Sequence, residues 1–141
     1  MPPSEFAYLR AVYPRLDSDQ LKEAVFQGMT SDPAGGRWLI ERARDSNEST
    51  KLRKSALFWA GQDQDTPTAQ LLSVYRDGGD ESLREHAIFV LSQRQDEAAT
   101  DALMRIARED KDNRMRSKAL FWLAQKKDPR VMKLISDLVL K

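Results

Sequence analysis

Apolar residues recur along this chain at the spacing of one helix face, and the helical stretches themselves recur. The stretch from Lys51 to Gln62 reads KLRKSALFWAGQ, residues 83–93 read LREHAIFVLSQ, residues 115–125 read MRSKALFWLAQ, and residues 21–31 carry a looser copy. Equivalent positions are 31, 31 and 32 residues apart, at Leu21, Leu52, Leu83 and Met115. A fixed period of this length indicates an α-solenoid, in which each short unit packs on the next. We call these stretches the A helices.

A second helix, the B helix, is predicted in every unit, because a helix-start signal follows each A helix. The pairs Asp32-Pro33, Thr66-Pro67 and Asp128-Pro129 place an N-cap oxygen before a proline, and Asp96-Glu97 lacks only the proline. The connectors between units, at residues 45–49, 77–79 and 110–111, are short and polar, which makes neighbouring helices antiparallel. The pattern therefore predicts four A/B pairs, preceded by one B-like helix from Ser4 to Tyr13 that Pro14 ends.

The A helices are apolar around most of their circumference, which predicts burial on more than one side. Trp59 and Trp122 lie in this apolar part and are predicted to be core residues, as is Leu21 on the first A helix. The B helices carry a narrower apolar stripe and leave their other face free for solvent or a partner. Gly35 and Gly36 should loosen the start of the first B helix, because glycine is a poor helix former. The stripes end at Ala43, Tyr75, Ala107 and Val139.

The start of each A helix resembles HEAT repeats of the short kind, about 30 residues long, that is common in bacterial proteins. An aliphatic residue precedes a basic one in Leu52-Arg53, Leu83-Arg84, Met115-Arg116 and, more weakly, Leu21-Lys22. The resemblance implies an all-α, right-handed α-solenoid of about four helix pairs preceded by one extra helix, in a single domain over residues 1–141. The repeats would span residues 16–45, 46–77, 78–109 and 110–141, after a partial repeat at 4–13.

Composition narrows the function classes. Lysines and arginines number 23 against 22 acids, so no global field draws the chain to nucleic acid or to a membrane. There is no cysteine, and His86 is the only histidine, which argues against a metal site; no cofactor is expected. No apolar run is long enough to span a membrane and no signal peptide is visible, which leaves the compartment open. No phosphate loop or nucleophile elbow occurs, so the sequence predicts a non-enzymatic protein.

Two columns of polar residues are predicted to be structural. An arginine one turn into an A helix can reach an acid or a helix-end carbonyl of the preceding unit and so form a structural ladder along the array. The glutamines at the ends of the A helices can bond to carbonyls that the helix leaves without partners. The ladder residues are Arg53, Arg84 and Arg116, and the glutamines are Gln62, Gln93 and Gln125.

The resemblance to HEAT arrays implies a partner on the face lined by the second helices of each repeat. Arg44, Arg76 and Arg108 recur there at steps of 32 residues. As cations in the last turn of a helix, they interact favourably with the helix dipole. Together with Arg37, Arg105 and Lys133, they can also make this side locally basic and able to bind an acidic protein segment. We therefore predict a protein-binding scaffold. The alternatives are a nucleic-acid-binding array that resembles the HEAT-like DNA glycosylases, or a spacer in a larger protein.

The two ends of the array are apolar, although terminal repeats normally carry a polar outer face. The first helix offers Phe6, Tyr8 and Leu9, and the sequence closes on Leu138-Val139-Leu140-Lys141. The sequence therefore predicts that one or both ends are covered by a neighbouring domain or by a second copy of the chain.

Overall fold

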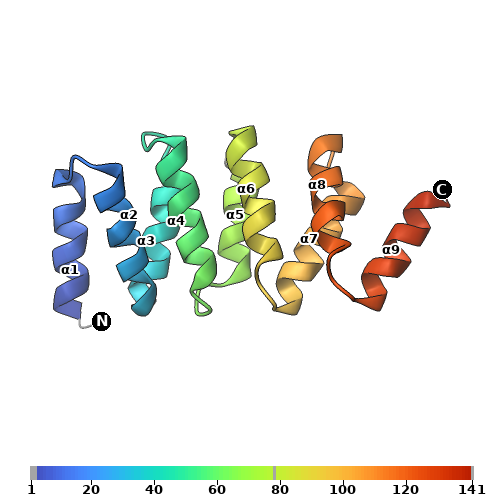
Figure 1. The fold of residues 1–141 in the computed structure, drawn as a ribbon, viewed down its shortest axis with the longest axis horizontal. Coiled ribbons are helices and arrows are strands. Elements are labelled where there is room, and N and C mark those ends of the chain that lie inside the picture. The colour runs from blue at the N-terminus through green and yellow to red at the C-terminus, as the bar shows by residue number, and fades with distance from the viewer. Residues whose placement is uncertain (1–2, 78, 141) are drawn as a thin grey trace.

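The chain folds into a row of antiparallel helices (Figure 1). This computed structural model describes residues 3–77 and 79–140, without the side chains of residues 3, 4 and 31. The helix α1 (Pro3–Val12) precedes four A/B pairs: α2 (Asp19–Gly28) with α3 (Pro33–Arg44), α4 (Thr50–Gln62) with α5 (Thr68–Asp77), α6 (Glu81–Ser92) with α7 (Glu97–Glu109), and α8 (Asn113–Leu123) with α9 (Pro129–Val139). The described residues contain no strand, so the prediction of an all-α solenoid is confirmed.

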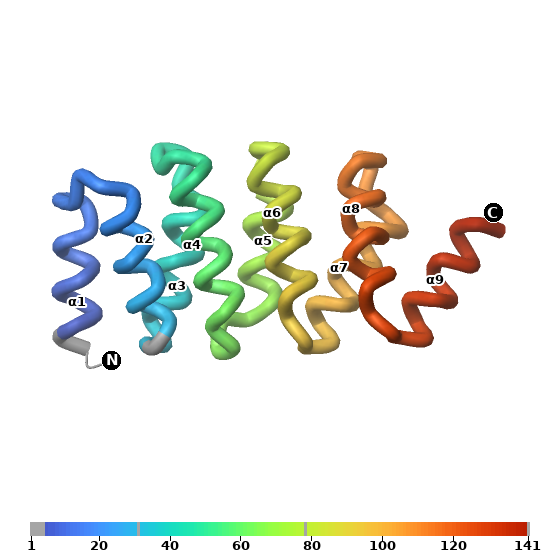
Figure 2. The backbone as a smooth tube through the Cα atoms, in the orientation of Figure 1, coloured from blue at the N-terminus to red at the C-terminus, as the bar shows by residue number. Residues whose placement is uncertain are grey.

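The helices form two layers, and the backbone trace in Figure 2 alternates between these layers along the array. In the A layer α2 packs on α4, α4 on α6 and α6 on α8, while in the B layer α3 packs on α5, α5 on α7 and α7 on α9. Each of α3, α5 and α7 also packs on the A helix of the next unit. These contacts bury the alanine column at Ala56, Ala87 and Ala119 completely, because no larger side chain separates the neighbouring helices there. The core therefore runs along the whole array.

The helix-start aspartates act as the sequence predicts. Oδ1 of Asp32 accepts the N–H of Ala34 at 2.7 Å, and Asp128 caps Arg130 in the same way at 2.9 Å. The α-helical part of α1 ends at Val12, and a 3₁₀ turn (η1, Tyr13–Arg15) follows it. A second 3₁₀ turn (η2, Met29–Ser31) replaces the last predicted turn of α2. The predicted capping role of Ser4 falls on a side chain outside the described residues.

Gly36 is a point of close approach between units. Helix α3 is regular from Pro33 onwards, so its first turn is not the loose segment that helix propensity predicts. A Cβ on Gly36 would lie 2.3 Å from Oγ1 of Thr66 and 2.8 Å from Oδ2 of Asp63. Glycine is therefore needed here because the loop between α4 and α5 packs directly on the helix backbone.

Two predicted core residues are instead exposed at the ends of the array. Leu21 is 50% exposed, whereas its equivalents Leu52 and Leu83 are buried, because no A helix of the described residues precedes α2. Val139 is 77% exposed, whereas Tyr75 is buried, because α6 covers α5 and no described helix covers α9 in the same way.

The other apolar residues at the ends differ in exposure. Tyr8 is 67% exposed and Leu140 is 82% exposed, whereas Phe6, Leu9 and Leu138 pack partly against the core. Lys141 lies outside the described residues. That another domain or a second copy covers these ends stays a prediction, as do the repeat boundaries drawn from the sequence.

Candidate protein-binding surface

The six basic residues predicted to bind a partner all lie exposed on B helices. They are distributed over four helices, because the apolar stripe of each B helix faces the A layer and directs the remaining positions outward. We call this set the basic face. It consists of Arg37 and Arg44 on α3, Arg76 on α5, Arg105 and Arg108 on α7, and Lys133 on α9.

Two residues of the basic face share a hollow between α3 and α5. Arg37 and Arg44 line it together with Ile40, Ser73 and the acids Glu41 and Asp45. The hollow measures about 450 Å³ and is widely open. Nη2 of Arg44 lies 3.2 Å from Oδ2 of Asp77 in the next unit, so this arginine is already paired, whereas Arg37 has no ion pair with a described residue.

The other residues of the basic face are not gathered into one pocket. Arg105 pairs with Glu109 on its own helix at 3.7 Å. Arg108 lines a separate hollow of about 280 Å³ with Leu134 and Leu138. Arg76, Arg108 and Lys133 form no ion pair with a described acid, so the free charges of the basic face are distributed over four B helices.

Arg53 and Arg116 bind helix-end carbonyls of the preceding unit. Nε of Arg53 donates to the carbonyl oxygen of Ala43 at 2.8 Å, and Nε of Arg116 donates to that of Ala107 at 3.1 Å. Both acceptors lie in the last turn of a B helix, where carbonyls lack partners within the helix. These contacts support a structural role for the two arginines, which stays a prediction until substitutions test it.

Arg84 makes a different junction. Its guanidinium lies over the ring of Tyr75, 4.8 Å from the centroid, and Nη2 lies 3.6 Å from Oδ2 of Asp110. The Tyr75 hydroxyl donates to the same carboxylate. Burial and this hydrogen bond raise the pKa of Tyr75 above its ordinary value.

The same arrangement occurs at the first junction, so junctions of two kinds alternate along the array. The Tyr13 hydroxyl donates to Oε2 of Glu48 at 2.7 Å, and Lys22 lies over the tyrosine ring. Tyr13 and Tyr75 are 62 residues apart, and Ala43 and Ala107 are 64 apart. Tyrosine junctions thus alternate with carbonyl junctions, a period of two units that the pattern of single repeats does not show.

The three glutamines do not behave as one column. Nε2 of Gln125 donates to the carbonyl of Phe121 at 3.4 Å, in the last turn of α8, as a helix-end role requires. Nε2 of Gln93 donates instead to Oγ of Ser92, and Gln62 has no side-chain hydrogen bond with a described residue. The shared role predicted for this column therefore has support only at Gln125.

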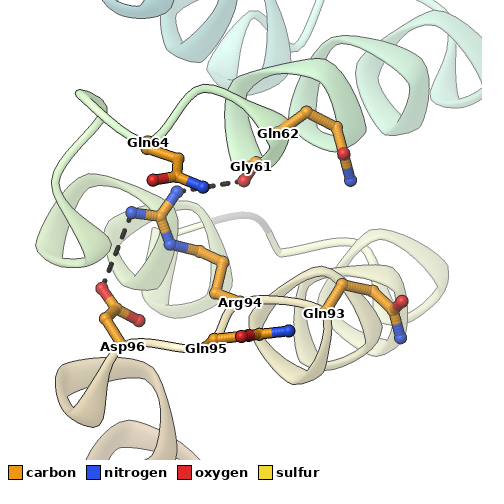
Figure 3. Close-up of a pocket in the computed structure, with 7 residues that line it drawn as sticks. All are labelled: Gly61, Gln62, Gln64, Gln93, Arg94, Gln95 and Asp96. Atoms are coloured by element: carbon orange, nitrogen blue, oxygen red, sulfur yellow. Dashed lines mark hydrogen bonds and ion pairs between the residues drawn. The ribbon is translucent and has the colours of Figure 1, made fainter.

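Arg94 is a further structural residue, and the sequence analysis missed it. Its guanidinium donates to the carbonyl of Gly61 at 3.0 Å (Figure 3). It also donates to the carbonyls of Asp63 at 3.2 Å and Thr66 at 2.8 Å, in the loop that follows α4. Nη2 also lies 3.6 Å from Oδ2 of Asp96. The side chain thereby fills one side of a polar hollow lined by Gly61, Gln62, Gln64, Gln93, Arg94, Gln95 and Asp96.

The outer face of the A layer carries half-exposed aromatic rings, contrary to the prediction that Trp59 and Trp122 are core residues. Both tryptophans are only partly buried, and Phe121 is 57% exposed. The buried tryptophan is Trp38, which packs edge-on against Tyr13 with ring centroids 5.1 Å apart. The larger rings of the repeated A-helix motif therefore point away from the B layer.

His86 lies beside these rings, half-buried on α6. Its ring is 5.7 Å from that of Phe89, and Nε2 is buried with no hydrogen bond to a described residue. Burial and the charge of Lys54 lower the pKa of His86 below its ordinary value. In the described part of the chain, no three histidine, cysteine or acidic side chains lie close enough together to hold a metal.

Comparison with protein families identifies the repeats. A family model described as HEAT repeats matches residues 36–124 and 68–141. Neither the curated proteins nor the solved structures gave a match to the chain. Within residues 3–77 and 79–140, every helix is too short or too polar to cross a bilayer.

Proposed function

Because the chain belongs to the HEAT-repeat family, we propose that it is a non-catalytic binding module whose basic face receives an acidic segment of a partner protein. HEAT repeats generally serve protein interaction and scaffolding, and the family is typically non-enzymatic. The repeat fold suits this role, since a stack of short units offers a long surface whose residues recur at regular steps.

The observation that carries the proposal is a set of exposed cations without partners. Arg37, Arg76, Arg108 and Lys133 lie on successive B helices, and none forms an ion pair with a described acid. Arginines that join neighbouring units are paired by contrast: Nη1 of Arg130 lies 2.9 Å from Oδ1 of Asp101. The free cations therefore do not stabilise the fold through ion pairs, and they are open to carboxylates from outside.

Arginine suits this task better than lysine, because its planar guanidinium binds a carboxylate through two parallel hydrogen bonds. Each exposed pair contributes at most about 1 kcal/mol. Several pairs along a row are needed for useful affinity, and a segment with regularly spaced acids can engage them together. Binding of this kind weakens as salt screens the exposed charges.

The test is the binding of a fluorescently labelled polyglutamate peptide, followed by anisotropy at low and moderate salt. Arg76→Ala with Arg108→Ala should weaken binding about five- to thirty-fold, because two exposed contacts are lost. The matched control replaces Lys51 on α4 and Lys127 in the loop between α8 and α9, which are both exposed and lie outside the B helices. It removes the same charge and should bind almost as the parent does.

Three outcomes count against the proposal. Equal losses in both double variants would mean that net charge alone attracts the peptide. Unchanged binding in the variant at Arg76 and Arg108 would place the partner surface elsewhere. Tighter binding of a labelled oligonucleotide, lost in the same variant, would assign the row to nucleic-acid phosphates instead.

A further inference from the structure

The A helices α4, α6 and α8 lie in front of the B helices in Figure 1, and they line a second surface with features of a binding site. A hollow of about 610 Å³ lies between α6 and α8, with Lys54 of α4 at its edge. Phe89, Phe121 and Trp122 form its apolar wall, and Ser82 and Ser117 are among its polar residues. The hollow is separate from the basic face, since all its lining residues belong to A helices.

The rings in this wall contact one another while staying partly open to solvent. Trp122 lies edge-on between two phenylalanines, with ring centroids 5.4 Å from Phe89 and 5.1 Å from Phe121. Phe121 is 57% exposed, so a large apolar area faces water at a fixed position. Rigid aromatic rings lose little side-chain entropy when a ligand covers them, which makes them efficient anchors.

The rings also recur along the array. Phe58, Phe89 and Phe121 occupy equivalent positions at steps of 31 and 32 residues, one on each of α4, α6 and α8. Packed helix axes are about 8–10 Å apart. Three residues of a polyproline II helix span about 9.3 Å, so a proline at every third position faces the same side at nearly the helix spacing. A segment that crosses the A helices can therefore place one proline against each aromatic position.

The polar groups at this surface complement such a segment. The indole N–H of Trp122 forms no hydrogen bond with a described residue. It can donate to a carbonyl of a polyproline II backbone, which has no internal hydrogen bonds. Lys54 forms no ion pair with a described acid, so a carboxylate of the segment can pair with it.

Charge along α4, α6 and α8 favours the same partner. The two acids of α4, α6 and α8 are both on α6 and are already paired: Glu81 with Arg114 at 2.7 Å and Glu85 with Lys118 at 3.0 Å. We propose that this hollow, together with the aromatic row, binds a proline-rich protein segment in the polyproline II conformation that carries an acidic residue beside its prolines. The site is independent of the basic face and adds a second partner contact on the opposite layer.

The experiment is a fluorescence titration of the full chain with a synthetic peptide that has proline at every third position and one flanking glutamate. A glycine–serine peptide of equal length and charge is the control ligand. We expect saturable binding of the proline peptide alone. Phe121→Ala should weaken it about ten-fold, since it removes an exposed anchor without opening the core. Lys54→Ala should weaken it about three-fold.

The matched control variant is Tyr8→Ala, which removes an aromatic ring that is 67% exposed on α1 and should leave binding unchanged. The variant at Arg76 and Arg108 should also bind the proline peptide normally, which separates this site from the basic face. The proposal is wrong if the proline peptide does not saturate, if Phe121→Ala binds it as the parent does, or if the glycine–serine peptide binds equally well. Binding of oligothymidylate that Phe121→Ala weakens would show instead that the rings stack on bases.

Discussion

Replacement of Arg94 by alanine should cost more stability than the loss of any exposed ion pair in this chain. The arginine side chain is 9% exposed and donates to three backbone carbonyls of the preceding unit. A hydrogen bond to a charged group contributes about 1.5–3 kcal/mol, and a buried acceptor without a donor costs about 1–3 kcal/mol. Water can reach part of the loop once the side chain is gone, so we expect a net loss of about 3 kcal/mol. The Asp96 carboxylate adds little, since its side chain is 42% exposed.

Urea denaturation followed by far-ultraviolet circular dichroism measures this loss, which corresponds to a fall in melting temperature of about 10 °C. Arg94→Lys should lie between the parent and the alanine variant, because one ammonium group cannot reach all three carbonyls. Arg114→Ala is the control: its side chain is 64% exposed, and its ion pair with Glu81 should contribute at most about 1 kcal/mol. If Arg94→Ala unfolds at the same urea concentration as Arg114→Ala, the reasoning is wrong.

Two further predictions concern glycine packing and pH. Gly61→Ala should destabilise the chain by about 1–3 kcal/mol, because its Cβ would lie 2.3 Å from Cγ1 of Val90. Gly28→Ala should be neutral or stabilising, since among the described residues its Cβ meets only Leu9, at 3.8 Å; equal effects of the two changes in urea melts would contradict this. The lowered pKa of His86 means that the unfolded chain takes up the proton first, so stability should fall as pH drops below about 6.5 and level off below the folded pKa. His86→Gln should remove this part of the pH dependence, and an unchanged profile would refute the assignment.

The fold was predictable because the repeat period is visible in the sequence, but the burial of individual residues was not predictable. The equivalent residues Leu21 and Leu52 differ in exposure because a preceding A helix covers only Leu52. Aligned repeat positions do not show which residues a neighbouring helix covers. Trp59 and Trp122 were misplaced for a related reason. Hydrophobicity shows that a helix is largely apolar, but it does not show which ring lies at the margin of the apolar surface. That position depends on how the next helix packs.

The candidate site was predictable in position but not in pairing. All six residues of the basic face are exposed as expected, because their spacing follows the B-helix stripe. That Arg44 is paired with Asp77 depends on a contact 33 residues away along the chain. The position equivalent to Arg94 holds an acid, Asp63, in the preceding unit but a cation, Lys126, in the next unit. This pair of cations 32 residues apart is the sequence signal that could have found Arg94, since Lys126 in turn donates to the carbonyl of Arg94 at 3.3 Å.

The alternation of junctions makes the array mechanically uneven. A carbonyl junction, as between Arg53 and Ala43, joins a cation to a neutral backbone group that is shielded from water. A tyrosine junction depends partly on Arg84 and the carboxylates of Asp110 and Asp112, which are 14% and 35% exposed. Dissolved ions weaken exposed charge pairs more than buried hydrogen bonds. Rising ionic strength should therefore soften every second joint of the solenoid and leave the joints between them stiff.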